Sequence, residues 1–395
     1  MSKAVSGGAL AGTVVIDASR VLAGPYAGQI LGDHGAEVIK IETFGGDDTR
    51  AYGPPFVDDV APYYLGLNRN KKDLALDLGS DAGREVLFQL LERADVLIEN
   101  FKLSTWKKWG VNDLSALRDR FPRLIHCRIS GFGDKGELGG LPGYDAALQA
   151  LSGLSSINGD PDGQGTRIGI PLVDTSTGMH AAMGVLLALL ERARSGKGQQ
   201  VEATLFDTAL AMLHPHTANV LHGGKSARTG NGHPNIVPYD LFPTATEPLF
   251  LAIGNDRQFA TLCRLLGNPE LSEKPEYRNN AQRVRNRNAL REDLVALMAN
   301  QDAQALFRTL MDHGVPCAPV LTVEQSLQQQ HTLDREMKVS IGRYHGIGIP
   351  VKLDRTPGSV RLPPPGIGEH SVETLTRFGF DAERIAALRD QNIIQ

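Results

Sequence analysis

The stretch 13–42, TVVIDASRVLAGPYAGQILGDHGAEVIKIE, decides the fold class of this chain. Apolar residues fill 13–17, and residues 36–42 alternate in polarity as a strand does. Between them, Pro25 suits the first position of a helix, and Gly35 ends that helix after about Asp33. A strand, a helix and a second strand in this order form a βαβ unit, whose strands are parallel. We therefore expect an α/β fold with an open parallel sheet.

The same alternation continues beyond residue 42. It predicts strands at 73–78, 95–100, 124–130 and 199–206, and helices at 80–93, 112–120 and 175–193, with Ser80 as the N-cap of the first of these helices. Ligands of such sheets bind beyond the carboxyl ends of the strands. The turns that follow Ile16, Ile98 and Ile129 are therefore the places to look for a site.

The chain also predicts a second, smaller domain. A glycine-rich polar stretch at 223–240 is the best domain boundary. We divide the chain into a large domain whose N-terminal part is 1–205, a linker at 206–230, a small α+β domain at 231–325 and a C-terminal segment, 326–395, that returns to the large domain.

Composition narrows the class of protein. The 395 residues carry 41 Lys and Arg against 45 Asp and Glu, a net charge of −4, which argues against nucleic-acid binding. The longest apolar run, 181–190, is too short for a membrane span, and residues 1–12 lack a signal core. Three scattered cysteines do not form a disulfide framework or a zinc cluster. We expect a cytoplasmic enzyme with reduced thiols, no metal and no membrane contact.

Several motifs favour structural roles over chemistry. GFGDKG at 131–136 fits a dinucleotide-binding pattern, but loop sequence follows where a helix is needed. His214, His216 and His222 lack a carboxylate or cysteine at ligand spacing, which favours a polar helix face. The arginines within 278–287 are interpreted as a solvated face.

Asp174, in GIPLVDTSTGMHAAMG at 169–184, is the most informative acidic residue. It precedes the predicted helix 175–193, so it suits an N-cap, and the helix dipole favours its ionised form. An ionised carboxylate can attack an activated acyl group, and the small residues 175–178 leave room for backbone N–H groups near an oxyanion. Its position alone does not separate cap from nucleophile.

Six stretches together resemble one family, the family III CoA-transferases, which include formyl-CoA transferase and the carnitine CoA-transferases. They stand in the family's order and cover nearly the whole chain: VLAGPYAGQILGDHGAEVIKIE at 21–42, NRNKKDLALDL at 68–78, DVLIENF at 95–101, ISGFG at 129–133, PGYDAALQALSG at 142–153 and the Asp174 segment. The small domain, with GNGHPNIVPYDLF at 230–242, looks most like the branch that uses succinyl-CoA with glutarate or hydroxymethylglutarate.

This resemblance implies a Rossmann-like large domain, an interlocked homodimer and a catalytic Asp at Asp174. That residue attacks an acyl-CoA thioester to give a mixed anhydride, then an aspartyl-CoA thioester, which an acceptor carboxylate attacks. No cofactor is bound permanently, because coenzyme A enters as the acyl-CoA substrate. Carried over by position, the CoA-contacting residues are Val21, Leu22, Ala23, Leu76, Asn100, Phe101, Lys102, Lys108, Trp109, Tyr144 and Asp145.

The acyl and acceptor sites are less closely matched. Tyr52 aligns with an aromatic residue of the acyl pocket, and Arg50, Asn231 and His233 are candidates for binding the acceptor. Thr43 and Gly79 stand where formyl-CoA transferase has cationic residues, so Lys71, Lys72 or Lys107 are candidates for holding the nucleotide phosphates instead.

Three other functions remain as alternatives. An α-methylacyl-CoA racemase shares this fold, but it needs two bases, and Tyr144 stands where that branch has a His; a phenol is a poor base near neutral pH. A CoA-binding module without catalysis would fit a chain that lacks Asp174. A nicotinamide oxidoreductase depends on the 131–136 loop alone.

Overall fold

The computed structural model describes residues 7–395. The expectation that residues 1–12 lack a signal core therefore falls partly outside the described residues. The chain forms two compact units. Unit 1 contains the chain up to Ser152 together with 169–212 and 330–395, and unit 2 contains 153–168 and 213–329. Residues 153–168, which the sequence assigns to the large domain, therefore belong with unit 2.

Unit 1 is built on a parallel sheet of β1 (Val14–Asp17), β2 (Glu37–Glu42), β3 (Lys71–Ala75), β4 (Val96–Glu99), β5 (Ile125–Ser130) and β6 (Gln200–Thr204). The strand order is β3-β2-β1-β4-β5-β6, and every pairing is parallel. This is the doubly wound order, in which the chain reverses its course between β1 and β4. The predicted open parallel sheet is confirmed.

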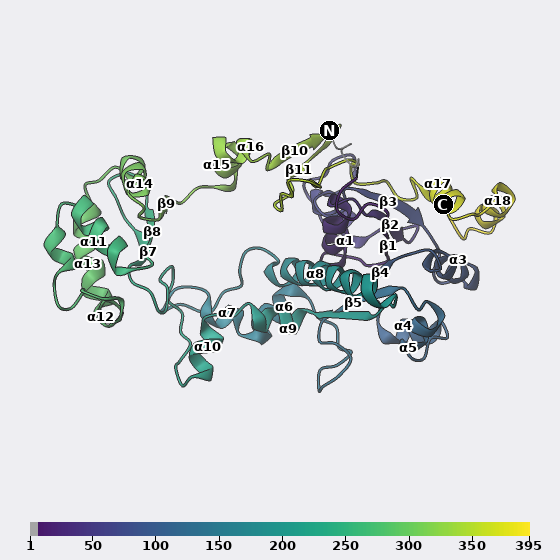
Figure 1. Cartoon of the computed structure of the whole chain (residues 1–395), viewed down its shortest axis with the longest axis horizontal. Coiled ribbons are helices and arrows are strands. Elements are labelled where there is room, and N and C mark those ends of the chain that lie inside the picture. The colour runs from purple at the N-terminus through teal and green to yellow at the C-terminus, as the bar shows by residue number, and fades with distance from the viewer. Residues whose placement is uncertain (1–6) are drawn as a thin grey trace. The chain divides into compact units, whose positions relative to one another are not determined.

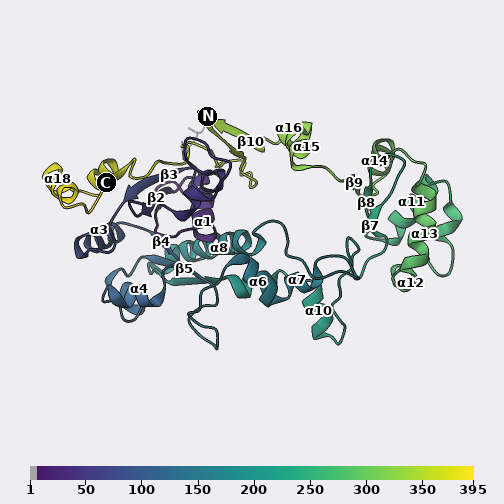
Figure 2. The same ribbon diagram turned by 180° about the vertical axis from the view of Figure 1, so that it is seen from behind.

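Helices cover both faces of this sheet. On one face α1 (Ala23–Asp33) packs along α8 (Leu172–Ser195), as Figures 1 and 2 show. The opposite face is covered by α3 (Asp81–Leu91), α4 (Leu103–Lys108), α5 (Ser115–Arg120), α17 (Ser371–Arg377) and α18 (Ala382–Asp390). Strand residues such as Ile16 and Ile39 form a buried core with Leu87, Trp106 and Leu375 from these helices. The C-terminal segment thus returns to the sheet.

Helix starts follow capping chemistry, with three departures from prediction. The helix predicted at 112–120 is α5, which begins three residues later, at Ser115. The side chain of Ser80 accepts a hydrogen bond from Gly83 N and caps α3 as predicted. Helix α1 begins at Ala23, two residues before Pro25, and α8 begins at Leu172, three residues before the predicted start. Pro25 still lies in the first turn, where a missing N–H breaks no helical bond.

Unit 1 also contains short elements around the sheet. These are η1 (Asp48–Ala51), α2 (Pro62–Leu65), α6 (Asp145–Ser152), α9 (Leu205–Ala211), α16 (Gln330–Asp334) and the hairpin of β10 (Lys338–Ile341) and β11 (Tyr344–Ile347). The helical stretch after β6 is interrupted: α9 ends at Ala211, and α10 (His216–Leu221) begins after Pro215.

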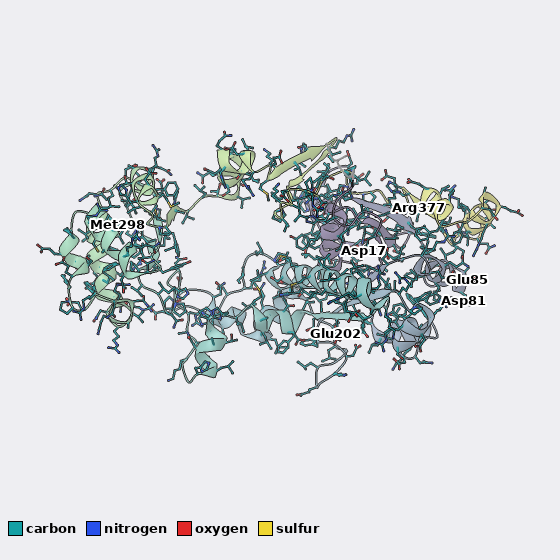
Figure 3. All side chains as sticks on the ribbon, in the orientation of Figure 1. Asp17, Asp81, Glu85, Glu202, Met298 and Arg377 are labelled. Carbon is teal, nitrogen blue, oxygen red and sulfur yellow. The ribbon has the colours of Figure 1, made fainter. Side chains whose placement is uncertain are left out.

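Unit 2 is a small α+β unit. Its antiparallel sheet has the order β7 (Tyr239–Phe242), β8 (Leu249–Ala252), β9 (Cys317–Pro319). The helical elements are α7 (Leu154–Ile157), α10, α11 (Asp256–Leu265), η2 (Pro269–Ser272), α12 (Asn280–Arg285), α13 (Arg287–Met298), α14 (Ala303–Asp312) and α15 (Val323–Gln328). Met298, labelled in Figure 3, belongs to its core with Leu251 and Phe259.

One arginine of unit 2 departs from prediction. Arg283 is fully buried, not part of a solvated face. It donates hydrogen bonds to Val237 O and Tyr277 O, pairs with Asp256 at 2.7 Å and stacks over Phe259. Its role is to tie α12 to the core of unit 2.

Three features bear on the predicted class of protein. Helix α8 is long and apolar enough to cross a membrane by length and composition, but it packs against α1 and β6 as the core helix of a globular protein does. Cys127, Cys263 and Cys317 are buried free thiols. Among residues 7–395, no cluster of three His, Cys, Asp or Glu side chains is placed to hold a metal ion.

Candidate active site

A cavity of about 210 Å³ opens at the carboxyl ends of β1, β4 and β5. Its walls are the loop after β1 (20–23), the loop after β4 (100–103), the loop after β5 (130–131 and 140–144) and Asp174 on α8. This is the point where the strand order reverses, the usual ligand crevice of doubly wound folds. The turns singled out from the sequence therefore meet in one place.

The loop after β1 is held by side chains from neighbouring strands. The amide of Asn100 accepts a hydrogen bond from Arg20 N at 3.1 Å and donates one to Arg20 O at 2.9 Å. Val21 N donates to the carboxylate of Asp47. Asn100 therefore joins the β1 and β4 walls of the cavity.

The loop after β4 is held by the side chain of Glu99, the last residue of β4, which is fully buried. Its carboxylate accepts a hydrogen bond from Phe101 N at 2.6 Å and lies 2.9 Å from His126 Nε2. The Phe101 ring meets Trp106 and Trp109 edge-on, with centroids 5.7 and 5.0 Å apart. One wall of the cavity is thus aromatic and backed by a buried charge.

Asp174 lies in the first turn of α8 and lines the cavity. The carboxylate that receives the helix's free N–H groups is that of Asp145, which accepts from Val173 N at 2.7 Å and from Asp174 N at 3.1 Å. The predicted N-cap role of Asp174 is therefore wrong. The N–H groups at the start of α8 are capped instead by the carboxylate of Asp145, which belongs to α6. Asp174 remains available for chemistry.

The ionisation of Asp174 also differs from the expectation. Burial, followed by the negative charge of Asp145, raises the pKa of Asp174 to about 7. The expectation that the helix dipole keeps this carboxyl fully ionised at neutral pH is thus corrected, because removal from water outweighs the favourable position. A carboxyl poised near neutral pH is typical of catalytic groups.

The small residue Gly178 allows α8 to approach the loop after β1. A Cβ at Gly178 would lie 2.6 Å from Ala23 O and 3.2 Å from the Tyr26 ring. Ser176, two residues earlier, is buried with no hydrogen-bond partner for its hydroxyl. Close packing of α8 on α1 therefore brings Asp174 to the loop 20–23.

Sequence reasoning missed Tyr63, from α2. Burial raises the pKa of Tyr63 to about 12, and the next contribution is the nearby charge of Asp174. Its ring meets that of Tyr52 edge-on at 5.5 Å, and Tyr52 itself is half exposed. The sequence PYYL gave no signal for this, because only the fold brings α2 toward α8.

Most of the predicted CoA-contacting residues lie at the cavity. Val21, Leu22, Ala23, Asn100, Phe101, Lys102 and Tyr144 line it, and Arg20, Leu103 and Arg128, which the sequence did not suggest, line it too. Asp145 does not line the cavity, and its carboxylate caps α8 instead. Trp109 reaches the site only through its contact with Phe101, and Lys108 is exposed at the end of α4.

Other predicted residues lie elsewhere. Leu76 is fully buried in the sheet core. The Arg50 guanidinium is bonded to Glu42 at 2.8 Å and to Tyr64 at 2.6 Å, a buried network that weighs against its binding a substrate carboxylate. Lys71 pairs with Asp17 at 2.8 Å in the interior, and Lys72 pairs with Glu37 and Glu373, which weighs against phosphate contacts.

Asn231 and His233 belong to unit 2. They line a separate cavity of about 660 Å³ there, together with Arg228 and Arg287. The His233 ring stacks against Tyr239 with centroids 5.2 Å apart. Thr43 is exposed after β2, and Gly79 N donates to Asp77, so neither brings a charged group to the cavity of unit 1.

Comparison with known proteins identifies the family to which this chain belongs. The family model for CoA-transferase family III matches residues 10–371. The chain belongs to CoA-transferase family III. It is a CoA-transferase, as the sequence resemblance implied.

Individual relatives agree over nearly the whole chain. The succinate–glutarate CoA-transferase of Agrobacterium fabrum is 38% identical over 93% of this chain and 95% of its own. The acetyl-CoA:oxalate CoA-transferase of Acetobacter aceti is 38% identical over 87% of this chain and 88% of its own. The crystal structure of a CAIB/BAIF family protein from Brucella suis, 36% identical, superposes with a TM-score of 0.83 and covers 94% of this chain and 100% of that one. These relatives support the family and the fold, and they differ in the acceptor that their names state.

Proposed function

We propose that this CoA-transferase moves CoA from an acyl-CoA, with succinyl-CoA as the donor, to a short dicarboxylate such as glutarate. The observation that carries the proposal is Asp174, a partly ionised carboxyl at the ligand crevice of a doubly wound sheet. Similarity to the succinate–glutarate enzyme supports the choice of substrates.

In the proposed mechanism, Asp174 is the nucleophile. Its carboxylate attacks the thioester carbonyl, the carbon–sulfur bond breaks, and the CoA thiolate leaves a mixed anhydride on Asp174. The thiolate then attacks the aspartyl carbonyl and releases the donor carboxylate, which gives an aspartyl-CoA thioester. The acceptor carboxylate attacks this thioester to form a second anhydride, and CoA returns to the new acyl group.

The cavity supplies what these steps need. The backbone of 20–23 and the side chains of Asn100 and Phe101 are proposed to hold CoA, with Lys102 and Lys108 toward its phosphates. Tyr52 and the newly found Tyr63 are proposed to border the acyl group near Asp174. Water must be kept from the anhydride, and the aromatic side chains and the burial of Asp174 serve that end.

For the acceptor we retain Asn231 and His233 as binding residues. They line the cavity of unit 2. Arg228 and Arg287 line it too, but both guanidinium groups already donate to backbone oxygens, so the proposal rests on Asn231 and His233. Arg50 is not included, because its guanidinium is already bonded to Glu42 and Tyr64.

We also propose that the working form is a homodimer whose chains interlock. Its support is an exposed apolar stripe on α8, formed by Met179, Met183, Leu186, Leu187 and Leu190. Exposed apolar patches of this kind mark interaction sites. The three free cysteines are in keeping with a reducing compartment, and we place the enzyme in the cytoplasm.

The test is a matrix of acyl-CoA donors against carboxylate acceptors, read by mass spectrometry of the CoA products. We expect succinyl-CoA with glutarate to give the highest kcat/KM. Much better use of oxalate or carnitine than of any dicarboxylate would overturn the substrate assignment and leave the family membership intact.

The racemase alternative has its own test. The enzyme incubated with a 2-methylacyl-CoA in deuterated water should give no deuterium at the α-carbon, because the phenol of Tyr144, which stands where the racemases have a His, is a poor base near neutral pH. Rapid incorporation would favour the racemase.

A further inference from the structure

A buried ion pair lies beside the loop that follows β1. Lys40, on β2, is fully buried, and its ammonium nitrogen lies 3.1 Å from a carboxylate oxygen of Asp47 and 3.0 Å from the backbone oxygen of Ser19. Asp47 is also buried. Neither side chain lines the active-site cavity, so neither has a role in the mechanism described above.

The backbone conformation of Val21 depends on this pair. Val21 has φ of +72°, in the left-handed region that a β-branched residue rarely adopts and that costs free energy to hold. Its N–H donates to Asp47 Oδ2 at 3.2 Å and to Oδ1 at 3.4 Å. Since Val21 and the next two residues line the cavity, this conformation sets the course of the loop along the ligand site.

The two oxygens of Asp47 have different partners. Oδ1 caps η1 by accepting from Thr49 N at 3.0 Å and from the Thr49 hydroxyl at 2.8 Å. Oδ2 accepts from Lys40 and makes the shorter contact to Val21. An asparagine at this position can keep the cap with its oxygen while its amide group removes the acceptor for Lys40 and Val21.

Stability alone is a weak reason for such a pair. Lys40–Asp47 lies among other buried pairs on the same sheet, Lys71–Asp17 at 2.8 Å and Arg50–Glu42 at 2.8 Å. Apolar replacements of buried ion pairs are often as stable as the pair itself, because desolvation offsets the attraction. A role in positioning the strained loop accounts for the pair better.

We propose that Lys40 and Asp47 are positioning residues that hold Val21 in its left-handed conformation and thereby preform the CoA-binding loop. This inference rests on the proposed function in one respect, namely that CoA is the ligand of this loop. It adds that the affinity for CoA depends on two residues that do not touch it.

The test measures binding of free CoA to the full-length chain by calorimetry, without turnover. Asp47→Asn should weaken CoA binding about tenfold, because Val21 loses the acceptor that offsets its strain. Adding Val21→Gly to this variant should restore affinity to within about threefold of Val21→Gly alone, because glycine adopts positive φ without support. A merely structural role of Asp47 would not be rescued by a glycine at position 21.

Two further variants complete the design. Asp119→Asn, at an exposed carboxylate on α5 that does not line the cavity, should bind CoA within about twofold of wild type. If Asp47→Asn alone is poorly folded, Lys40→Met combined with Asp47→Asn removes both charges together and leaves the neighbouring pairs balanced, and it should show the same loss and the same rescue.

A folded Asp47→Asn protein with wild-type CoA affinity, or no rescue by Val21→Gly, would overturn the inference. A wild-type chain that does not bind CoA would instead contradict the proposed function, and the inference with it.

Discussion

Asp174 lies where two effects on a carboxyl group oppose each other. Burial and the charge of Asp145 raise its pKa to about 7, whereas a nucleophile must be ionised. In the proposed mechanism the site must exclude water so that an anhydride can survive, and the same exclusion of water leaves part of Asp174 protonated at neutral pH. The balance predicts how activity and stability change with pH.

The first prediction concerns the pH profile. The kcat/KM for the donor should fall as pH drops through about 7, because the free enzyme loses its carboxylate nucleophile. In Asp145→Asn this limb should move to lower pH, because the repelling charge is gone while the amide oxygen can still cap α8. Initial rates from pH 5 to 9 measure both. An unmoved limb in a folded Asp145→Asn enzyme would contradict this account.

The second prediction concerns stability. The folded-state pKa of Asp174 lies above its ordinary value of 3.8, so the native state binds the proton more tightly, and stability is lost as pH rises from about 4 to 7. Asp174→Asn removes this penalty. It should raise the free energy of unfolding at pH 8 by an amount on the order of 2 kcal/mol, and have little effect near pH 4. Denaturant titrations at both pH values give the comparison; equal changes at the two would contradict it.

Individual residues were predicted from the sequence with mixed success. Asp174 and the loop 20–23 were expected at the site from a matching segment and from their place after a strand, and both line the cavity. Arg50 looked like a free cation, because the sequence does not show that Glu42 and Tyr64 surround it. Tyr63 was missed for the same reason: its nearness to Asp174 is a tertiary fact.

At the scale of elements, most strands were predicted to within one or two residues because buried parallel strands are apolar runs. The strand predicted at 73–78 is β3, which begins earlier, at Lys71, because the buried charged residues Lys71 and Asp73 break the apolar pattern there. Helix boundaries were harder. The start of α8 was placed too late, since its N-terminal N–H groups are capped by Asp145 from a distant part of the chain. The chain between α9 and α10 is not helical because it leads to Pro215, whose ring disfavours a helical conformation at the preceding residue.

The third prediction concerns the contact between the two ends of the loop after β5. A Cβ at Gly143 would lie 2.8 Å from Gly131 Cα and 2.8 Å from the Leu148 side chain. Gly143→Ala should therefore push apart the two ends of the loop after β5, at Gly131 and at residues 143–144, raising KM for the acyl-CoA and costing about 1–3 kcal/mol of stability. Steady-state kinetics and thermal unfolding measure the two effects.

Gly169→Ala is the matched control, because a Cβ there meets nothing within 4 Å. It should leave both KM and the unfolding temperature close to wild type. Wild-type kinetics in Gly143→Ala would show that this contact does not shape the site.

At the scale of the whole molecule, the division into units could be predicted only in part. The glycine-rich boundary near 223–240 lies close to the change of unit at residue 213. Residues 153–168 were assigned to the wrong side, because their bonds are to a distant arginine: Arg228 donates to the backbone oxygens of Ser156, Asp160 and Gly163. No local pattern indicates such a contact.

The fourth prediction concerns the proposed dimer. Leu187, at the centre of the α8 stripe, is 60% exposed. In the proposed dimer it is covered, so Leu187→Glu should shift the protein toward monomer and reduce activity. Light scattering at several concentrations measures the mass, and wild type should show about twice that of one chain.

Val372→Glu serves as the control on the opposite face of the sheet. Val372, on α17, is 39% exposed, and a charge there should leave the dimer intact. A fully active wild-type monomer would contradict the dimer.

The most direct test of the whole account is covalent labelling of Asp174 during turnover. Enzyme mixed with succinyl-CoA and hydroxylamine is digested, and its peptides are examined by mass spectrometry. The account predicts a hydroxamate on the peptide that contains Asp174, no label in Asp174→Asn, and a fall in transfer by orders of magnitude in that variant. Near-wild-type transfer by a well-folded Asp174→Asn enzyme, with no label on this peptide in wild type, would contradict it.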